Sequence, residues 1–411
     1  MIPSIQNCRA CESAEIEVVF DLGMQALSGV FRSVNVKDIL SGPLTLVKCK
    51  NCRLVQLKHS YPLDEMYNDG YGYRSGATAY MSQHLNEIIN FAIEKISLKK
   101  GENVLDIGSN DGTLLSLYPE GMYNRIGIDP AAKKYLDIYP KDAKVVTGFF
   151  NKENYYSVTS KKAKIVTSIS MFYDLEKPIN FAKAVESVLS PDGVWVFEQS
   201  YLPAMLRQNS YDTICHEHLE YYSLAAIQHI VEQAGMKIID ASQNEVNGGS
   251  IRLAVAKKLS SLSDKISPEV TWLMEQEKNH NIYSNKSFVT FQENVNRQKS
   301  DLIRLLKELK KSGKTVIGYG ASTKGYVILQ HCNISTELLP FIGDITPFKD
   351  GTFTPGTRIP IISMEKAKSM KPDYFLALPW AFRSDILLRE KETLQDGTKF
   401  IFPLPFVEIV S

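Results

Sequence analysis

Four cysteines near the start of the chain form two Cys-x-x-Cys pairs. Cys8 and Cys11 frame one pair, and Cys49 and Cys52 frame the other. Each pair can bring two thiolates to one ion, and two pairs complete a tetrahedral shell of sulfur. Soft ligands in a closed tetrahedron favour zinc and leave no position for a substrate. We therefore expect a structural zinc ion, with disulfides or chance pairing as the alternatives.

This metal would stabilise the first part of the chain, residues 1–75. A segment of that size with irregular patterning buries too little apolar surface to hold itself together. A closed zinc shell performs no chemistry, so the reactive groups must lie further along the chain.

The densest group of reactive side chains lies between residues 211 and 222, in Tyr-Asp-Thr-Ile-Cys-His-Glu-His-Leu-Glu-Tyr-Tyr. Four interpretations compete: a second metal site, a Cys215 nucleophile, core histidines, and general acid–base catalysis. His-Glu-His is not the His-Glu-x-x-His pattern of zinc hydrolases. We favour acid–base catalysis, in which a histidine takes a proton and a carboxylate supports it. The candidates in this segment are His216, Glu217, His218 and Tyr222.

Tyrosines crowd the stretch after the cysteine pairs, with Tyr71 and Tyr73 in Tyr-Gly-Tyr-Arg-Ser-Gly. A phenol can donate a hydrogen bond to an enolate oxygen or bind a sugar. An aromatic seam between domains is the alternative.

Short apolar segments that alternate with helical patterns must position these groups. They lie at residues 103–108, 125–129, 143–147, 165–169 and 193–198, and helical patterns cover residues 85–96 and 181–189. This alternation predicts an α/β fold with a parallel sheet covered by helices on both faces.

A glycine loop follows the first of these strands, in Asp-Ile-Gly-Ser-Asn-Asp-Gly. Asp129, at the end of the next strand, can accept hydrogen bonds from ribose hydroxyls. The glycine spacing is not the dinucleotide pattern, and Asp111 would repel a pyrophosphate but tolerate a sulfonium or ammonium. We therefore expect S-adenosylmethionine, with a structural turn as the alternative. The predicted contacts are Asp106, Gly108, Asn110, Asp111, Gly112, Asp129, Ser170 and Met171.

A second strand–glycine–helix unit begins near residue 314 and contains Gly-Tyr-Gly-Ala-Ser-Thr-Lys-Gly. Helix-start amides and Lys324 suit the pyrophosphate of a sugar nucleotide, while NAD binding or a purely structural loop are the alternatives. Ser322, Asn247 and Arg252 are further substrate candidates, although Arg252 equally suits a salt bridge. We expect four parts: a zinc module (1–75), a methyltransferase domain (76–258), a helical connector (259–312) and a Rossmann-like domain (313–411).

Composition excludes several classes of function. The 47 basic and 46 acidic residues leave a net charge of +1, so no global field attracts nucleic acid or an anionic membrane. No apolar run approaches the roughly 20 residues of a membrane span, and the first residues lack a signal-peptide pattern. Zinc-type cysteine spacing favours a reducing cytoplasm.

The order of these motifs resembles the zinc-containing, S-adenosylmethionine-dependent C-methyltransferases of nucleotide-linked 4-keto-6-deoxy sugars. The shared segments include the cysteine pairs, the tyrosine segment, the first glycine loop, Trp195–Gln199, Asn247–Arg252 and the second glycine loop. The resemblance implies zinc in the first domain, the methyl donor in the central sheet, and the nucleotide sugar against the C-terminal domain.

In such enzymes a base removes the proton beside the 4-keto group, and the enolate carbon takes the methyl group. The resemblance implies His218 as the base and Glu217 as its helper. Two positions depart from the family pattern: Cys215 replaces a frequent tyrosine, and Tyr173 replaces a histidine beside the sugar. Competing functions are an NAD(P)-dependent reductase or epimerase of a nucleotide sugar, and a noncatalytic binding module.

Overall fold

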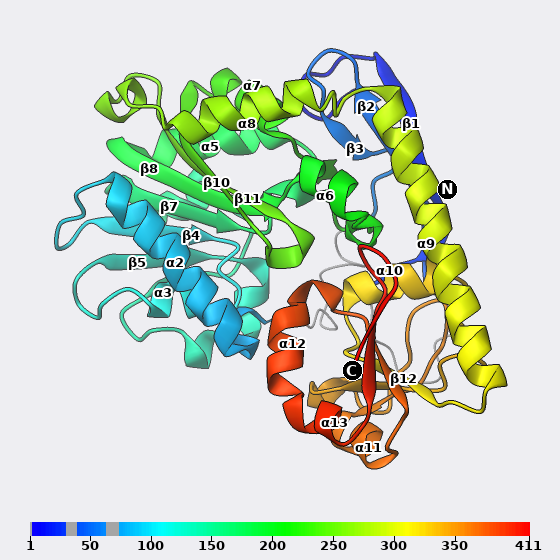
Figure 1. Cartoon of the computed structure of the whole chain (residues 1–411). Coiled ribbons are helices and arrows are strands. Elements are labelled where there is room, and N and C mark those ends of the chain that lie inside the picture. Colours follow the sequence, from blue (N-terminus) through cyan, green and yellow to red (C-terminus); the bar gives the residue numbers. More distant parts are fainter. Residues whose placement is uncertain (1, 30–38, 63–73) are drawn as a thin grey trace.

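The computed structural model describes residues 2–29, 39–62 and 74–411 (Figure 1). Within these ranges the strands form three sheets, of four, seven and six strands. Tyr71 and Tyr73 lie outside the described residues. Among the described helices, none combines the length and the apolar character needed to cross a membrane.

The N-terminal sheet combines residues that lie far apart in sequence. Its strands are β1 (Ile16–Ala26), β2 (Ser41–Cys49), β3 (Val55–Leu57) and β9 (Glu220–Tyr221), in that order. β9 pairs antiparallel with β3, so Val55 faces Tyr221 and Gln56 faces Glu220. The strand that directly follows the histidine-rich segment thus belongs to the cysteine module.

The central sheet has the order β10-β11-β8-β7-β4-β5-β6. Its strands are β4 (Asn103–Ile107), β5 (Asn124–Ile128), β6 (Lys144–Val146), β7 (Ala163–Ile169), β8 (Leu189–Ser200), β10 (Met236–Asn244) and β11 (Ser250–Lys257). The first five pair in parallel, as expected. The sheet also contains an antiparallel part that was not predicted, because β10 and β11 form an antiparallel hairpin and β11 runs antiparallel to β8. The short connection over residues 245–249 permits only this antiparallel return.

Helices cover both faces of this sheet. They are α2 (Ala79–Lys95), α3 (Thr113–Ser116), α4 (Lys152–Tyr156), α5 (Pro178–Val188), α6 (Leu202–Gln208) and α7 (Leu224–Gln233). The predicted stripe on α2 buries Leu85, Ile88, Ile89 and Ala92 against one side of the sheet. α5 and α7 pack on the other side with Phe197 and Trp195. An α/β domain with helices on both faces is therefore confirmed.

The expected helical connector consists of α8 (Pro268–Asn279) and α9 (Asn285–Lys311). Figure 1 shows α9 running from the N-terminal sheet to the C-terminal domain. Its apolar stripe, from Phe288 and Phe291 to Leu306 and Leu309, is buried rather than merely packed on the surface. This stripe joins the N-terminal sheet and the C-terminal domain in one apolar core.

The C-terminal domain is a second α/β unit. Its sheet has the order β14-β13-β12-β15-β16-β17, with β12 (Val316–Tyr319), β13 (Ile342–Asp344), β14 (Ile361–Ser363), β15 (Tyr374–Ala377), β16 (Lys399–Phe402) and β17 (Glu408–Val410). The helices are α10 (Thr323–His331), α11 (Met364–Ser369), α12 (Arg383–Arg389) and α13 (Lys391–Gln395). Parallel pairing around β12 gives the expected Rossmann-like arrangement, closed by the antiparallel edge strand β17.

Candidate functional site

The four paired cysteines meet at one point. Their Sγ atoms all lie within 4.8 Å of one another. The Cys8–Cys52 and Cys11–Cys49 Sγ separations are both 3.5 Å, close to the ~3.8 Å between sulfurs around tetrahedral zinc. All six cysteines are free thiols, so the disulfide alternative is wrong. The donor set fits a structural zinc ion.

A side chain from β3 supports this sulfur cluster. Gln56 is fully buried, its amide donates to Cys8 Sγ at 3.2 Å, and its carbonyl oxygen accepts from the Arg9 N–H at 2.9 Å. Arg9 in turn donates to the Leu57 carbonyl at 2.5 Å. Hydrogen bonds that orient metal ligands hold such sites in shape.

The first glycine loop turns at the carboxyl end of β4, where ligands of open α/β sheets bind. Gly108 and Gly112 have positive φ angles of 74° and 75°. A methyl group at Gly108 would lie 3.1 Å from Met171 Cγ, so this loop meets the end of β7. Ser170 also has a positive φ, and its N–H donates to the Glu198 carbonyl at 2.7 Å.

Asp106 and Asp129 are both buried beside this loop. Asp129 accepts the Asn110 N–H at 2.9 Å and the Ala131 N–H at 2.5 Å. Asp106 accepts from the Thr167 hydroxyl at 2.6 Å. Burial raises the pKa of both carboxyls, that of Asp106 to about 7. Asp129 therefore holds the glycine loop from the end of β5.

Two predicted donor contacts also hold the segment before α2. Asp111 accepts the Gly76 N–H at 3.0 Å and the Arg74 guanidinium at 3.0 Å. Asn110 accepts the Ser75 N–H at 3.0 Å. These side chains therefore anchor residues 74–76 over the glycine loop.

His218 lies where the central domain meets the C-terminal domain. Its Nδ1 is 2.8 Å from the Thr213 carbonyl oxygen, which requires a proton on Nδ1 and leaves Nε2 with a free lone pair. The Tyr173 ring packs against the imidazole, with centroids 4.1 Å apart. Burial, and then the charge of Lys324, lowers the pKa of His218 to about 3. The imidazole is thus neutral at physiological pH.

Glu217 is a second titratable group at the same place. Burial raises its pKa to about 7. Its Oε2 accepts from Cys215 Sγ at 3.7 Å, and its Oε1 lies against Gly29. Burial also raises the pKa of Cys215 well above its ordinary value, so the thiol stays protonated. This protonation argues against Cys215 as a nucleophile.

Neighbouring residues of the segment point into the protein instead. His216 is 1% exposed, lies edge-on to Tyr61, and its Nε2 is 3.3 Å from the Gly42 carbonyl oxygen. Tyr222 is fully buried, stacks on Phe172 and donates its hydroxyl to the Phe172 carbonyl at 3.4 Å. Both side chains are therefore packed in the protein interior. Among the described residues, the grouping suited to a metal is the cysteine cluster, and it includes neither histidine.

Polar side chains from two domains meet beside His218. The Lys324 Nζ donates to the Asn247 carbonyl at 3.0 Å, and the Trp380 indole donates to Asp212 Oδ2 at 2.7 Å. Burial lowers the pKa of Lys324 and raises that of Asp212, while their mutual attraction acts in the opposite direction. This cluster, formed by Asp212, Asn247, Lys324 and Trp380, is called the seam below.

Arg252 lies away from the seam. Its Nε donates to Glu198 Oε2 at 2.9 Å, and Glu198 also contacts Asn244 at 2.8 Å and His84 at 2.5 Å. Burial tends to raise the pKa of Glu198, but His84 and Arg252 outweigh it and lower the pKa. This geometry favours the salt-bridge interpretation of Arg252.

The second glycine loop is filled by protein atoms. A methyl group at Gly320 would lie 2.8 Å from Pro379, and Ser322 caps α10 by accepting the Gly325 N–H at 3.1 Å. Asp344, the counterpart of a ribose-binding carboxylate, accepts from the N–H groups of Ala321 at 2.6 Å and Thr346 at 2.7 Å. The loop geometry therefore favours a structural role over NAD binding, and Lys324 is its projecting polar group.

Sequence reasoning missed Gly29, Asp212, Thr213, Gln199 and Trp380. Gln199 is fully buried at the end of β8, and within the described residues its amide atoms have no hydrogen-bond partner. The polar pair Glu-Gln at the end of a predicted strand could have marked Gln199 as a candidate site residue. Gly29 and Trp380 reach the site only through tertiary contacts, which no local pattern reveals.

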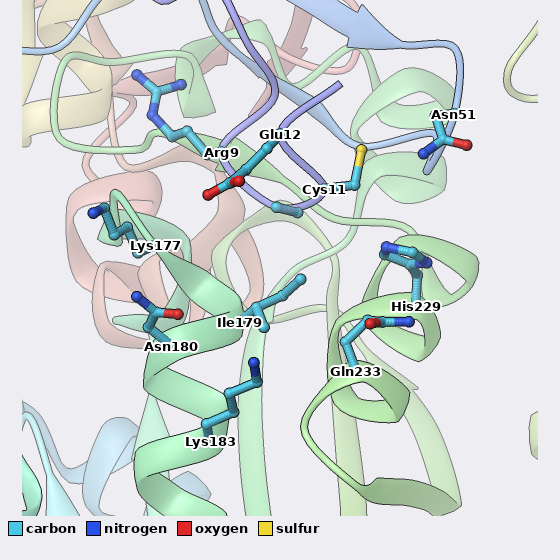
Figure 2. Close-up of a pocket in the computed structure, with 11 residues that line it drawn as sticks. Arg9, Cys11, Glu12, Asn51, Lys177, Ile179, Asn180, Lys183, His229 and Gln233 are labelled. Atoms are coloured by element: carbon cyan, nitrogen blue, oxygen red, sulfur yellow. The ribbon is translucent and has the colours of Figure 1, made fainter. Parts of the chain in front are cut away.

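A cavity lies apart from these residues. It measures about 400 Å³ and opens between the first cysteine pair, α5 and α7 (Figure 2). Figure 2 shows Lys177, Lys183, Glu12 and His229 around a polar space. Its lining includes neither Glu217 nor His218, and none of the residues beside them described above.

Comparison with known proteins agrees with this geometry. Three family models match in order: a zinc binding domain over residues 8–67, a methyltransferase domain over 77–241, and a C-methyltransferase C-terminal domain over 245–405. Together with the fold and the cysteine cluster, they define an S-adenosylmethionine-dependent methyltransferase with a zinc-binding module. The predicted cofactors, S-adenosylmethionine and structural zinc, are thereby confirmed.

The chain is 29% identical over 417 residues to the C-methyltransferase NovU of Streptomyces niveus. The alignment covers 100% of this chain and 98% of NovU. This relative and the C-terminal domain model support C-methyltransferase activity. Solved structures give shorter matches. An S-adenosylmethionine-dependent methyltransferase from Clostridium acetobutylicum shares 14% identity, covers 44% of this chain and 93% of that chain, and has a TM-score of 0.34. The cyclopropane synthase MmaA2 from Mycobacterium tuberculosis shares 14% identity and has a TM-score of 0.32. The match covers 54% of this chain and 80% of the synthase chain.

Proposed function

We propose that this enzyme methylates a ring carbon of a nucleotide-linked 4-keto-6-deoxy sugar. The observation that carries the proposal is the state of His218: Nδ1 is fixed by the Thr213 carbonyl at 2.8 Å, and Nε2 keeps a free lone pair. Transfer of a methyl group to carbon requires a carbanion, and a ketone makes the neighbouring C–H acidic enough for a positioned base. An O-methyltransferase would need no such carbon acid.

The proton of the carbon beside the ketone passes to His218 Nε2, and the electron pair of that C–H bond moves into an enolate. Burial and Lys324 lower the pKa of His218, so its Nε2 is unprotonated at physiological pH and has a lone pair for this proton. Glu217, with a pKa of about 7, can exchange a proton beside it. The burial of His218 limits access of water, which would otherwise compete for the carbanion.

S-adenosylmethionine, when bound, supplies a methyl group on a positively charged sulfur. Gly108, Asp129, Ser170 and Met171 at the strand ends of the central sheet are the residues that would hold it, with Asp129 toward the ribose. Asn110 and Asp111 shape the same loop by fixing residues 74–76. Neutralisation of a carbanion by a sulfonium is favoured in a dry cleft.

The nucleotide sugar lies at the seam in this proposal. Lys324 is a half-buried amine at the start of α10, beside His218 and Asn247, and can pair with a pyrophosphate. Tyr173, against the His218 ring, borders the sugar. The neighbouring Asn247 and Ser322 complete the proposed substrate contacts.

A labelling experiment tests the proposed reaction. Purified enzyme is incubated with ¹³C-methyl S-adenosylmethionine and a panel of 4-keto-6-deoxy sugars linked to different nucleotides. We expect the label on a ring carbon adjacent to the ketone, identified by NMR. A label on oxygen, or no transfer to any member of the panel, would contradict the proposal. Calorimetry with NADPH serves as a control, and we expect no binding.

A further inference from the structure

We propose that the N-terminal zinc module forms part of the catalytic centre, because its Gly29 positions the carboxyl group of Glu217. A methyl group at Gly29 would lie 2.0 Å from Glu217 Oε1 and 3.2 Å from the carboxyl carbon. Within 4 Å of that point, the described heavy atoms nearest to it all belong to Glu217. The backbone of the zinc module therefore forms the wall against which this carboxyl group rests.

The segment that carries Gly29 is held in place from two sides. The Ala26 N–H donates to the Gln330 side chain at 2.7 Å, and the Gln330 amide donates back to the Ala26 carbonyl at 3.2 Å. Gln330 lies on α10, so the C-terminal domain fixes the end of β1. The Leu27 N–H also donates to the Leu40 carbonyl at 2.9 Å. Gly29 thus lies two residues beyond an anchored part of the chain.

The other side of the catalytic pair is also fixed by the zinc module. The Leu57 N–H donates to the Leu219 carbonyl at 2.7 Å, one residue after His218, and β3 pairs with β9 immediately beyond. The Leu219 N–H donates to the Tyr173 carbonyl at 2.8 Å. The ring of the same Tyr173 packs on His218. Glu217 and His218 therefore lie between two contacts with the first domain, at Gly29 and at β3.

This inference rests on the proposed function, since it assigns Gly29 a positioning role for Glu217. A Gly29→Ala substitution tests it, because Gly29 lacks the positive φ that would strain an alanine. The added methyl group meets only the end of a flexible side chain, which can move at low cost. We expect an unchanged melting temperature and zinc content, but kcat reduced about 100-fold by a displaced carboxyl group. Gly148→Ala is the matched control, since its methyl group would approach Asn154 at an ordinary 3.5 Å.

A double-mutant cycle separates this inference from the proposed function. In a Glu217→Ala background, Gly29→Ala should cause no further loss, because the group that it displaces is gone. A full additional loss in that background, or a wild-type rate for Gly29→Ala alone, would overturn the inference. Wild-type activity of Glu217→Ala alone would instead contradict the catalytic role of Glu217. Crystal structures of wild type and Gly29→Ala then test the position directly, and an unmoved carboxyl group would overturn the inference.

Discussion

At the scale of single residues, the candidate site depends on opposite pKa shifts of two adjacent residues, His218 and Glu217. Burial and Lys324 lower the pKa of His218, whereas burial raises that of Glu217, because desolvation disfavours the charged form of each group. The histidine therefore stays neutral across the working range of pH, and the carboxyl group titrates within it. Pairs of groups with pKa values shifted in opposite directions are typical of acid–base sites.

This division predicts the pH profile of the enzyme. Glu217 is protonated below about pH 7 and ionised above it, while His218, with a pKa of about 3, does not titrate there. If ionised Glu217 supports proton removal, kcat/KM rises with pH and levels off above about 7. Glu217→Gln should remove this limb and leave a lower, flat profile. A limb near pH 7 that persists in Glu217→Gln would assign the titration to another group.

The residue scale also explains a limit of sequence reasoning. His216, His218 and Tyr222 come from one short, irregular segment, and no periodicity predicts which of them faces a ligand. The structure turns His216 toward Gly42 and Tyr222 toward Phe172, while His218 reaches the seam. The residue types pointed to proton transfer, but tertiary packing selects the residue that can perform it.

At the scale of secondary structure elements, Glu198 links α2 to two strands of the central sheet. It lies on β8, contacts His84 of α2 at 2.5 Å and contacts Arg252 of β11 at 2.9 Å. Glu198→Gln would leave the buried Arg252 guanidinium without its carboxylate, at a cost of about 3–5 kcal/mol in unfolding free energy. Urea denaturation measures this loss. A change below about 0.5 kcal/mol would show that the network contributes little.

The zinc module contacts the segment of Glu217 and His218 through the pairing of β3 with β9, although the two lie far apart in sequence. Zinc removal should therefore loosen β9 as well as the cysteine loops, since Gln56 joins Cys8 to β3. Hydrogen–deuterium exchange with a strong chelator should show faster exchange at residues 215–221, with β12 and β15 unchanged as internal controls. Unchanged protection of residues 215–221 in metal-free protein would contradict this connection.

Elements with local signals were predictable and those with long-range pairing were not. The strands from Asn103 to Glu198 have contiguous apolar residues and glycine turns, and each was predicted close to its observed position. β9 has two residues, and its pairing with Val55 and Gln56 depends on a contact across most of the chain. The antiparallel hairpin of β10 and β11 was missed because strand direction is set by connection length, not by composition.

At the scale of the whole molecule, the candidate site needs all three sheets. In the proposed site, the central sheet holds the methyl donor, the C-terminal domain contributes Lys324 and Trp380, and the N-terminal module contributes β3 and Gly29. α9 joins the two outer domains in one apolar core. Each of the two glycine loops is recognisable in the sequence, and together they predicted the two α/β domains. The seam forms only where these domains pack together, so no local pattern predicts it.

The seam predicts a specific effect of losing its cation. Lys324→Met should raise the KM for a nucleotide sugar about 10- to 100-fold, because a charge-assisted contact with the pyrophosphate is lost. The affinity for S-adenosylmethionine should stay near that of wild type, measured by calorimetry. The matched control is Lys366→Met, at an exposed position of α11. An unchanged KM in Lys324→Met would remove this lysine from the substrate site.

Proton removal from carbon by His218 is the central claim, and solvent exchange measures it without methyl transfer. The keto-sugar nucleotide that accepts the methyl label is incubated in D₂O with enzyme and S-adenosylhomocysteine, and NMR follows the proton beside the ketone. We predict exchange with wild-type enzyme, and exchange at the buffer rate with His218→Ala, which should still bind S-adenosylmethionine. Exchange at the wild-type rate in His218→Ala would contradict the account.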